Sequence, residues 1–409
     1  MKILLLTNLF IPFTRGGAER IVELQANLFA QAGHEVLVVT PTPDPRFLES
    51  VLESGARVVR FRPRNLYFTL NDFRQSWWKR SLWHLIDLYH PYPKRFVCRV
   101  IASEKPDLVI TPNMKGFGLR AFEAIRESGA PHVHVLHDLQ LIVPSGLKIY
   151  GREKSWKTSG PLQCLYRRAT SWRLCSPRLV VSPSRYLLDA HRSAGFFPKS
   201  EARVLPNPAP WMGSARISNF SEKMPESRPD PTVLYVGQLA EHKGLRVLME
   251  AWGKGMRANL GIVGSGELEG EVQAFADKEP SVTFFGRKSP SEVRAMMSRA
   301  RLLVVPSLCY ENSPTVIMEA LSVGTPVIAS KIGGIPELVR EGEGTLVEPG
   351  NVEALREAIK KELQKPLDRE KIKKTTERFS IDAYKKNLLD LIVTIRTPVR
   401  HSSSDGGKE

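Results

Sequence analysis

The chain has few cysteines, and their spacing matches no common cysteine motif. Its 409 residues include four, Cys98, Cys164, Cys175 and Cys309, and no two of them form a C-x2-C pair. This spacing disfavours a disulfide framework, a zinc site and an iron–sulfur cluster. Unpaired cysteines are typical of a reducing compartment, so we expect a cytoplasmic protein.

Long apolar runs are also missing. A membrane-spanning helix needs about 18 or more apolar residues in succession, and no segment approaches that length. The opening MKILLLTNLF has a short apolar run that Asn8 interrupts, and no A-x-A cleavage site follows it. We therefore interpret it as a first buried strand and not as a signal peptide.

Acidic residues are too few to balance the basic ones. The chain has 59 Lys and Arg against 43 Asp and Glu, a formal net charge of +16. Residues 1–205 contain 30 of the basic and 16 of the acidic residues, so the excess belongs to the first half. Such a field attracts phosphate groups in nucleic acid, on an anionic membrane surface or in a diphosphate-bearing substrate.

Short apolar segments alternate with helical patterns along the chain, whose length predicts two domains. In the first half, strands are expected at residues 2–8, 34–41, 56–61, 107–112, 132–138, 179–184 and 202–208. The pattern restarts at 232–239, 258–266, 282–287, 301–307 and 325–334, with helices between the strands. This alternation is typical of parallel sheets built from βαβ units.

The fold class that we predict is therefore α/β, with two Rossmann-like, doubly wound parallel-sheet domains that face each other across a cleft. We expect one domain over residues 1–207, a Pro- and Ser-rich linker over 208–230 and a second domain over 231–379. A helix over 380–397 and a disordered tail over 398–409 follow. Parallel sheets bind ligands beyond the carboxyl ends of their strands, so the loops after strands are the candidate sites.

Two glutamates enclose a helix start in the second half. Glu311 lies in a loop after a strand, Ser313 is a good N-cap, Pro314 suits the first helical position and Glu319 lies about a turn and a half further on. We expect both carboxylates to face the cleft, where the helix N-terminus attracts a diphosphate and the carboxylates accept hydrogen bonds from sugar hydroxyls. The alternative is that Glu311 complements the helix dipole and Glu319 belongs to a solvated face.

Other polar loops follow strands or precede helices. Lys243 lies in the loop after the first strand of the second half, where it can meet a phosphate, although an ordinary turn with a surface lysine has the same pattern. Gly264 and Gly266 follow the next strand. Gly16 and Gly17 precede the first helix, as a phosphate cradle would, but their spacing is not the G-x-G-x-x-G of dinucleotide-binding proteins.

His137 stands at a strand end of the first half. A lone histidine at such a position is more often structural than catalytic, and both interpretations stay open. The sequence contains no H-E-x-x-H, G-x-S-x-G or P-loop motif. The classes of enzyme that use these motifs are therefore disfavoured.

The order of the segments GGAER, HD, VGQLAEHKG, IVGSGE, FFGR and ENSPTVIMEALSVGTPVIASKIGGIPE resembles the retaining, nucleotide-sugar-dependent glycosyltransferases of family four. The resemblance covers nearly the whole chain, and residues 304–337 are its most specific part. It implies a GT-B fold with the active site in the cleft between an acceptor-binding domain, residues 1–207, and a nucleotide-sugar-binding domain, residues 231–379. It also implies that the helix over 380–397 crosses back to the first domain.

The resemblance implies roles for particular residues. As catalytic residues we expect Glu311 on the hydroxyls of the transferred sugar, Lys243 on the diphosphate and His137 near the donor sugar. Glu319 would bind the ribose hydroxyls. The remaining donor-binding residues would be Gly16, Gly17, Gln238, Gly264, Gly266, Arg287, Asn312, Ser313, Pro314 and Thr315.

One departure from the family pattern affects donor binding. Many relatives carry an arginine where this chain has Gln238, and a glutamine lacks the charge and the two-pronged grip on phosphate. Either another base such as Arg15 or Arg185 compensates, or the donor binds more weakly. No Asp-x-Asp stands at a cleft strand end, so we expect no cofactor and no required metal; Lys243 and helix amides would stabilise the leaving diphosphate.

Residues 57–99 are both basic and aromatic, with ten Lys and Arg against two acidic residues. A helix is expected over 73–89, with apolar bulk and a basic side that are typical of interfacial helices. Its alternative is a core-packing helix with a solvated basic face. The residues that we expect to meet an anionic membrane or the acceptor are Arg74, Trp77, Trp78, Lys79, Arg80 and Trp83.

The sequence thus predicts a retaining, metal-independent glycosyltransferase that moves a sugar from a nucleotide-sugar donor to a saccharide or lipid-linked acceptor. We expect it to act in cell-envelope or exopolysaccharide synthesis, in the cytoplasm or on the inner face of the cytoplasmic membrane. A GT-B epimerase or a non-catalytic relative is an alternative. Nucleic-acid binding is a less favoured one, because no nucleic-acid-binding signature is present and the charge avoids the second domain.

Overall fold

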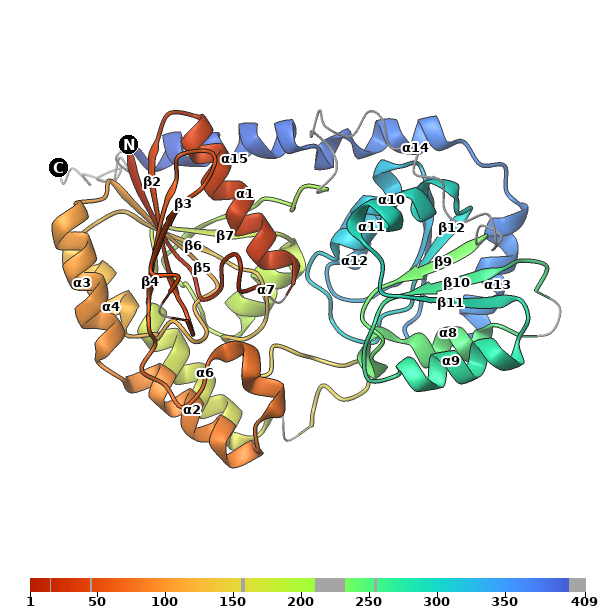
Figure 1. Cartoon of the computed structure of the whole chain (residues 1–409), viewed down its shortest axis with the longest axis horizontal. Helices are drawn as coiled ribbons and strands as arrows, with labels where there is room; N and C mark the ends of the chain where they lie inside the picture. Colours follow the sequence, from red (N-terminus) through yellow and green to blue (C-terminus); the bar gives the residue numbers. More distant parts are fainter. Residues whose placement is uncertain (15, 45, 156–158, 210–231, 254–255, 397–409) are drawn as a thin grey trace, which may run out of the picture.

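The computed structural model describes residues 1–14, 16–44, 46–155, 159–209, 232–253 and 256–396. They form two α/β lobes, one from each half of the chain, which lie side by side (Figure 1). Arg15, the predicted tail 398–409 and all but the first two residues of the predicted linker 208–230 lie outside the described residues.

The first lobe is built on an eight-stranded sheet in which all pairs are parallel except β3 with β4. Its strands, in spatial order, are β3 (Glu49–Val51), β4 (Arg57–Phe61), β2 (Glu35–Pro41), β1 (Lys2–Leu6), β5 (Leu108–Pro112), β6 (His132–Val135), β7 (Leu179–Ser182) and β8 (Glu201–Val204). The central strand β1 is apolar on both faces because helices cover the sheet on both sides, and Leu4 pairs in register with Leu37 and Val109.

The second lobe has a six-stranded parallel sheet. Its spatial order is β11 (Val282–Gly286), β10 (Leu260–Val263), β9 (Val233–Val236), β12 (Leu302–Val305), β13 (Val327–Ser330) and β14 (Gly344–Val347). The two sheets confirm the predicted fold class. The strands β3 and β14 were not predicted, because each is short and lacks an apolar run.

Helices cover both sheets. In the first lobe these are α1 (Gly17–Gln31), the 3-10 helix η1 (Thr69–Arg74), α2 (Trp77–Tyr89), α3 (Tyr92–Glu104), α4 (Ala121–Ser128), α6 (Pro161–Leu174) and α7 (Arg185–Ser193). In the second lobe they are η3 (Glu241–Lys243), α8 (Leu245–Ala251), α9 (Glu269–Lys278), α10 (Pro290–Arg299), α11 (Thr315–Ser322), α12 (Ile335–Leu338), α13 (Val352–Gln364), α14 (Arg369–Thr375) and η4 (Thr376–Phe379).

The last helix, α15 (Ile381–Arg396), returns to the first lobe (Figure 1). Its Tyr384 and Leu388 are buried in the apolar cluster that also contains Ile3 of β1. The Tyr384 hydroxyl accepts a hydrogen bond of 2.7 Å from Gln25 of α1. Burying such side chains stabilises the contact by about 1.5–3 kcal/mol each, so α15 ties the second lobe's chain end to the first lobe.

None of the helices within the described residues is both long and apolar enough to cross a bilayer.

Candidate functional site

A cavity of about 470 Å³ lies between the lobes, at the carboxyl ends of their strands. The first lobe contributes Gly17, Ala18, His137, Pro183 and Asn207. The second lobe contributes Tyr235, Val236, Gly237, Gln238, Lys243, Val305, Ser307, Glu311, Asn312, Ser313, Pro314, Thr315 and Val316. The predicted catalytic residues Glu311, His137 and Lys243 therefore lie on one cavity.

A close ion pair stands in the cavity wall. The Lys243 ammonium lies 2.6 Å from a carboxylate oxygen of Glu311, which also accepts a hydrogen bond of 3.0 Å from the Ser307 hydroxyl. Burial lowers the pKa of Lys243, but the neighbouring Glu311 charge outweighs it, so the pKa is raised overall. Lys243 therefore carries a positive charge that the cavity presents at neutral pH.

Main-chain hydrogen bonds bring these two side chains together from loops 68 residues apart. Lys243 ends the 3-10 turn η3, and the carbonyl of the preceding residue, His242, accepts hydrogen bonds of 3.0 Å from the amides of Leu308 and Cys309. The loop after β12 is thus attached to the loop after β9. Adjacent parallel strands place both loops at the same sheet edge.

Two glycines allow a third loop to pack on Glu311. Gly333 has φ +60°, and a Cβ there would lie 2.3 Å from the Glu311 carbonyl oxygen. At Gly334 a Cβ would lie 2.1 Å from the Asn312 carbonyl oxygen, and the Gly334 amide donates to the Glu311 carbonyl at 2.7 Å. Only glycines fit this close backbone approach, so the GG pair after β13 fixes the Glu311 loop.

The N-terminus of α11 opens onto the cavity. The helix begins at Thr315 with Pro314 as its N-cap, so the prediction of Ser313 as N-cap was wrong by one residue. The Ser313 side chain does not cap the helix, because Pro314 already takes that position in an extended conformation. The first amides of α11 are consequently available to an anion in the cavity.

Three buried polar atoms at the cavity have no hydrogen-bond partner among the described residues. They are the Ser313 hydroxyl, the Asn312 side-chain carbonyl and Nε2 of His137. Leaving such atoms unsatisfied costs about 1–3 kcal/mol each. A ligand with hydroxyl groups can satisfy all three, because the Asn312 carbonyl only accepts a hydrogen bond and a sugar hydroxyl can donate one.

His137 belongs to the first lobe and connects it to the second. Its main-chain carbonyl accepts a hydrogen bond of 3.0 Å from the Asn312 amide group. Burial lowers the pKa of His137 to about 4, so the ring is neutral at physiological pH. A neutral ring can donate or accept a hydrogen bond at a sugar hydroxyl but supplies no charge.

Five predicted donor-binding residues do not line the cavity. The Gly16 amide donates to the Glu19 carboxylate at the start of α1, and Arg287 is exposed. A Cβ at Gly264 would lie 1.9 Å from the Gly237 carbonyl and one at Gly266 would lie 2.4 Å from the Leu239 carbonyl, so both glycines serve backbone packing. Glu319 is half-buried on α11, where burial raises its pKa. The predicted ribose contact of Glu319 stays a prediction.

Some cavity residues were not found from the sequence. Tyr235 lies within β9 and Ser307 follows β12. Asn207 follows β8 in an Asn-Pro pair, a signal for a strand-end loop. The Tyr235 hydroxyl donates to the Gln238 carbonyl at 2.8 Å and so holds the loop in which the family arginine is replaced. In the described part of the chain, no three His, Cys, Asp or Glu side chains are close enough to hold a metal ion.

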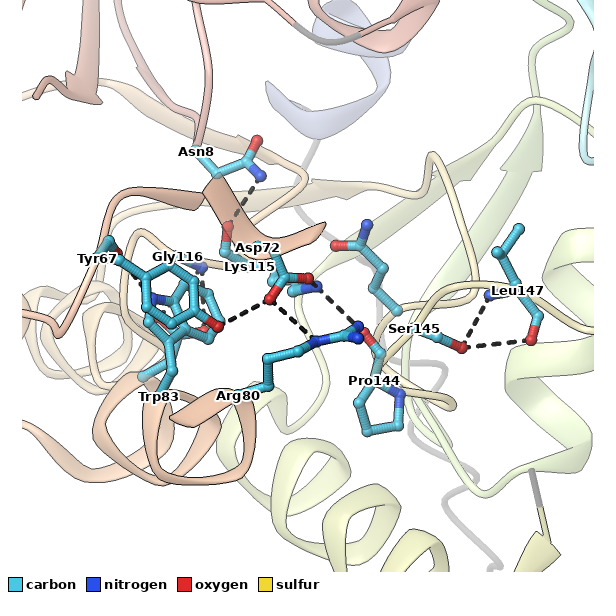
Figure 2. A network of polar contacts seen from close by, with 12 residues as sticks. Asn8, Tyr67, Asp72, Arg80, Trp83, Lys115, Gly116, Pro144, Ser145 and Leu147 are labelled. Atoms are coloured by element: carbon cyan, nitrogen blue, oxygen red, sulfur yellow. Dashed lines mark hydrogen bonds and ion pairs between the residues drawn. The ribbon is translucent and has the colours of Figure 1, made fainter. Parts of the chain in front are cut away.

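The basic, aromatic segment is attached to the first lobe by a buried network (Figure 2). Asp72 accepts hydrogen bonds from Tyr67 at 2.8 Å and from Lys115 at 3.4 Å, and it pairs with Arg80 at 3.4 Å. Trp83 is only 1% exposed and donates from Nε1 to the Tyr67 carbonyl at 2.9 Å. The prediction that Trp83 meets a membrane or the acceptor is therefore wrong, because its ring belongs to the core.

The other members of that prediction lie outside. Trp77 is 80% exposed and Trp78 53%, and Arg74 and Lys79 are exposed as well. Arg80 is half-buried beside Asp72. The helix is therefore amphipathic, as predicted. At one position, Trp83, the prediction placed a residue of the buried face on the surface.

Two protein families match the chain. The family Glycosyltransferase Family 4 matches residues 15–210, and the family Glycosyl transferases group 1 matches residues 217–379. The two matches divide the chain as the two lobes do and together cover most of it.

Several known proteins are similar over long stretches. An uncharacterised 42.6 kDa protein in the cps region of Klebsiella pneumoniae is 25% identical over 350 residues, 83% of this chain and 88% of that protein. A glycogen synthase of Mycobacterium tuberculosis is 26% identical and spans 90% and 87% of the two chains. The amylovoran biosynthesis glycosyltransferase AmsK of Erwinia amylovora is 33% identical over 150 residues, 33% of this chain and 37% of its own.

Solved structures share the fold. The Anabaena protein HepE, crystallised with UDP, superposes with a TM-score of 0.68 over 96% of this chain and all of its own, at 20% identity. At that identity the likeness establishes the two-lobed fold alone. With both family matches, it identifies the chain as a glycosyltransferase of the GT-B type that belongs to family four.

Proposed function

We propose that the chain transfers a sugar from a nucleoside diphosphate sugar to a hydroxyl group of a saccharide or lipid-linked acceptor. One observation supports this most directly. The Lys243–Glu311 pair shares a cavity with the unpartnered polar atoms of His137, Asn312 and Ser313. A diphosphate would meet the ammonium group, and sugar hydroxyls would satisfy the remaining polar atoms.

The donor would lie with its diphosphate toward Lys243 and the first amides of α11. These groups are fixed in place before the reaction, so they stabilise the charge that develops on the leaving diphosphate without reorganisation. Glu311 would keep Lys243 on one carboxylate oxygen and accept hydrogen bonds from hydroxyls of the transferred sugar on the other. The neutral His137 ring would hold a further hydroxyl, because it has a free Nε2 among the described residues.

We propose that transfer retains the anomeric configuration. The bond between the sugar C1 and the diphosphate oxygen breaks while the acceptor oxygen approaches from the same face, and the departing phosphate takes the acceptor's proton. Lys243 balances the charge of the leaving group, so the step requires no metal. Chelation with EDTA should then leave the rate unchanged, and proton NMR of the product should show the donor's anomeric form.

A thermal-shift panel of UDP-, GDP- and ADP-sugars tests donor binding. HepE was crystallised with UDP and with UDP-glucose, which makes UDP-sugars the first members of the panel. A ligand at about 100 times its Kd stabilises the fold by about 2.7 kcal/mol, a readily measured rise in Tm. If no nucleotide sugar raises the Tm, the proposal fails. Epimerised donor in place of transferred sugar would favour an epimerase.

The acceptor is proposed to belong to cell-envelope or exopolysaccharide synthesis. The support is the cps-region protein of Klebsiella and the amylovoran glycosyltransferase of Erwinia among the relatives. Such acceptors are frequently attached to lipids, so we propose a peripheral location on the inner face of the cytoplasmic membrane.

Two neighbouring helices offer a surface for that location (Figure 1). On α2, exposed apolar residues three or four positions apart share one face, namely Trp78, Leu82, Leu85 and Tyr89. On α6 the exposed apolar residues are Leu162, Leu165 and Trp172. The two helices are in contact at two places. The ring centroids of His84 and Tyr166 are 5.7 Å apart, and the Arg173 guanidinium carbon lies 5.3 Å from the centroid of the Tyr89 ring.

Basic residues accompany these apolar side chains, with Arg74 and Lys79 exposed around α2 and Arg168 exposed on α6. A protein surface that binds an anionic membrane typically places aromatic residues at the level of the headgroups and cations on the lipid phosphates. Co-sedimentation with vesicles at low salt tests it, with Leu82→Ser and Leu85→Ser combined as the variant and Val393→Ser, exposed on α15, as the control. Equal binding to neutral and anionic vesicles would reject the surface.

A further inference from the structure

Glu311 lies between two residues that the opposite lobe holds. The Tyr310 amide donates to the Lys148 carbonyl of the first lobe at 2.9 Å. On the other side, the Asn312 side-chain amide donates to the His137 carbonyl at 3.0 Å. The carboxylate belongs to the second lobe, but its immediate neighbours in the chain are bonded to the first.

The contact before Glu311 is a short antiparallel ladder across the cleft. Ile149 forms a β-bridge with Cys309, and the Tyr150 amide donates to the Leu308 carbonyl at 2.8 Å. The first-lobe residues 148–150 thus pair with 308–310 through their main chains. Such paired backbone fixes the direction in which the chain enters Glu311.

The Tyr310 side chain adds a second attachment to the same segment. Its hydroxyl donates to the Glu153 carboxylate at 2.9 Å, and its ring stacks on Tyr186 with centroids 5.8 Å apart and planes at 18°. The Lys148 ammonium lies 4.7 Å from the ring centroid. The ring packs against the apolar clusters of both lobes, so it lies at the contact between the two lobes.

We propose that Tyr310 is a positioning residue for the transfer reaction. Through the backbone it holds the Glu311 carboxylate against Lys243, and it does so only while the first-lobe residues 148–153 occupy their place. Correct approach of the two lobes is thereby a condition for the correct placement of Glu311. The inference rests on the proposed function, in which Glu311 binds the donor sugar.

Three conservative variants separate this role from simple packing. Tyr310→Phe keeps the ring and its stacking but removes the donation to Glu153. Glu153→Gln removes the charged acceptor at nearly constant size. Tyr150→Phe is the matched control, because it removes a hydroxyl from the same segment on a ring that is 45% exposed.

The first measurement is steady-state turnover of the nucleotide sugar that gives the largest thermal shift. A charge-assisted hydrogen bond is lost, so Tyr310→Phe and Glu153→Gln should each lower kcat about tenfold while KM for the donor stays within about twofold. The double variant should lose no more than either single one. Wild-type kcat in both single variants, or a fall in kcat that only follows a fall in Tm, would overturn the inference.

The second measurement does not need the donor. Hydrogen exchange in the peptide covering residues 306–312 should be faster in Tyr310→Phe than in wild type and unchanged in Tyr150→Phe. Unchanged exchange in Tyr310→Phe would overturn the inference even if every nucleotide sugar failed to bind. A failed panel with faster exchange would instead count against the proposed function and leave the attachment of Glu311 to the first lobe supported.

Discussion

The two lobes share one architecture but hold their polar residues in different ways. The half of the chain that contains the second lobe is nearly balanced in charge, with 29 basic and 27 acidic residues over 206–409. Most of this lobe's cavity residues stand in short loops or turns that follow strands. The first lobe has the basic excess and contributes fewer residues to the cavity. Its long segment between β4 and β5 is held by buried ionic contacts around Asp72 and Lys115 (Figure 2).

This difference predicts how each lobe responds to substitutions. In the second lobe, main-chain hydrogen bonds between loops place Lys243 beside Glu311, so a substitution of either side chain leaves these contacts in place. The segment in the first lobe depends on contacts between residues far apart, and removing one partner of a buried ion pair costs about 3–5 kcal/mol. We therefore expect substitutions in the second lobe's loops to affect chemistry and those in the first lobe's segment to affect folding.

The largest effect on stability is expected within one helix of the first lobe. Trp83→Ala should lower the free energy of unfolding by about 3–5 kcal/mol, because it leaves a cavity and an unpaired Tyr67 carbonyl. Trp77→Ala, at an 80% exposed position of the same helix, should change it by less than about 0.5 kcal/mol. Urea unfolding measures both, and similar losses would contradict the assignment of the buried face.

In the second lobe the largest effect should be on catalysis. Glu311→Gln should lower the rate of sugar transfer by about 10²–10³, since the charge that orients Lys243 and the donor sugar is lost. The Tm should change little. Glu341→Gln, at an exposed position of the same lobe, is the control for the loss of one negative charge. Transfer at the wild-type rate in Glu311→Gln would remove the basis for the proposed mechanism.

A buried carboxyl group of the first lobe should make the free energy of unfolding depend on pH. Burial raises the pKa of Asp87 from its ordinary value of 3.8 to about 7 in the folded state. The folded protein then binds this proton more tightly than the unfolded chain, so the free energy of unfolding falls as the pH rises from about 4 to about 7.

Asp87→Asn should lack this decline, a difference of ~1–3 kcal/mol between pH 4 and pH 8. Urea unfolding across that range measures it, with Asp189→Asn at an exposed position as the control. Parallel stability curves for wild type and Asp87→Asn would show that Asp87 titrates normally.

The smallest effect is expected at Gln238. Gln238→Arg restores the charge that many family members have, and we expect UDP to bind about three- to tenfold more tightly, at most ~1.4 kcal/mol. The Tyr235 bond to the Gln238 carbonyl does not use the side chain, so the loop should keep its shape. Weaker binding would indicate that the second lobe has been adapted to a glutamine at this position.

How far the sequence predicted the molecule also differs between the lobes. The strands and the Lys243 and Glu311 loops were recognisable because buried parallel strands are apolar runs and the site lies where they end. The packing contacts of Gly264 and Gly266 were not, since a glycine needed for backbone packing and one that lines a donor pocket look alike in sequence.

Trp83 shows the other limit. Helical spacing shows that Trp83 and Trp77 point in different directions, but it does not show which of the two faces packs on the lobe. The buried face is set by Tyr67, which accepts a hydrogen bond from Trp83 and donates one to Asp72. The attachment of Tyr310 to residues 148–153 was equally beyond the sequence, because about 160 residues separate the partners and no local pattern marks the pairing.

The central claim is that Lys243 binds the diphosphate of a nucleotide sugar in the cavity between the lobes. Calorimetric titration of UDP into wild type, Lys243→Ala and the control Lys278→Ala, exposed at the end of α9, tests it most directly. We predict that Lys243→Ala raises the Kd by about tenfold or more and that Lys278→Ala leaves it unchanged. Equal affinity for UDP in wild type and Lys243→Ala would contradict the account.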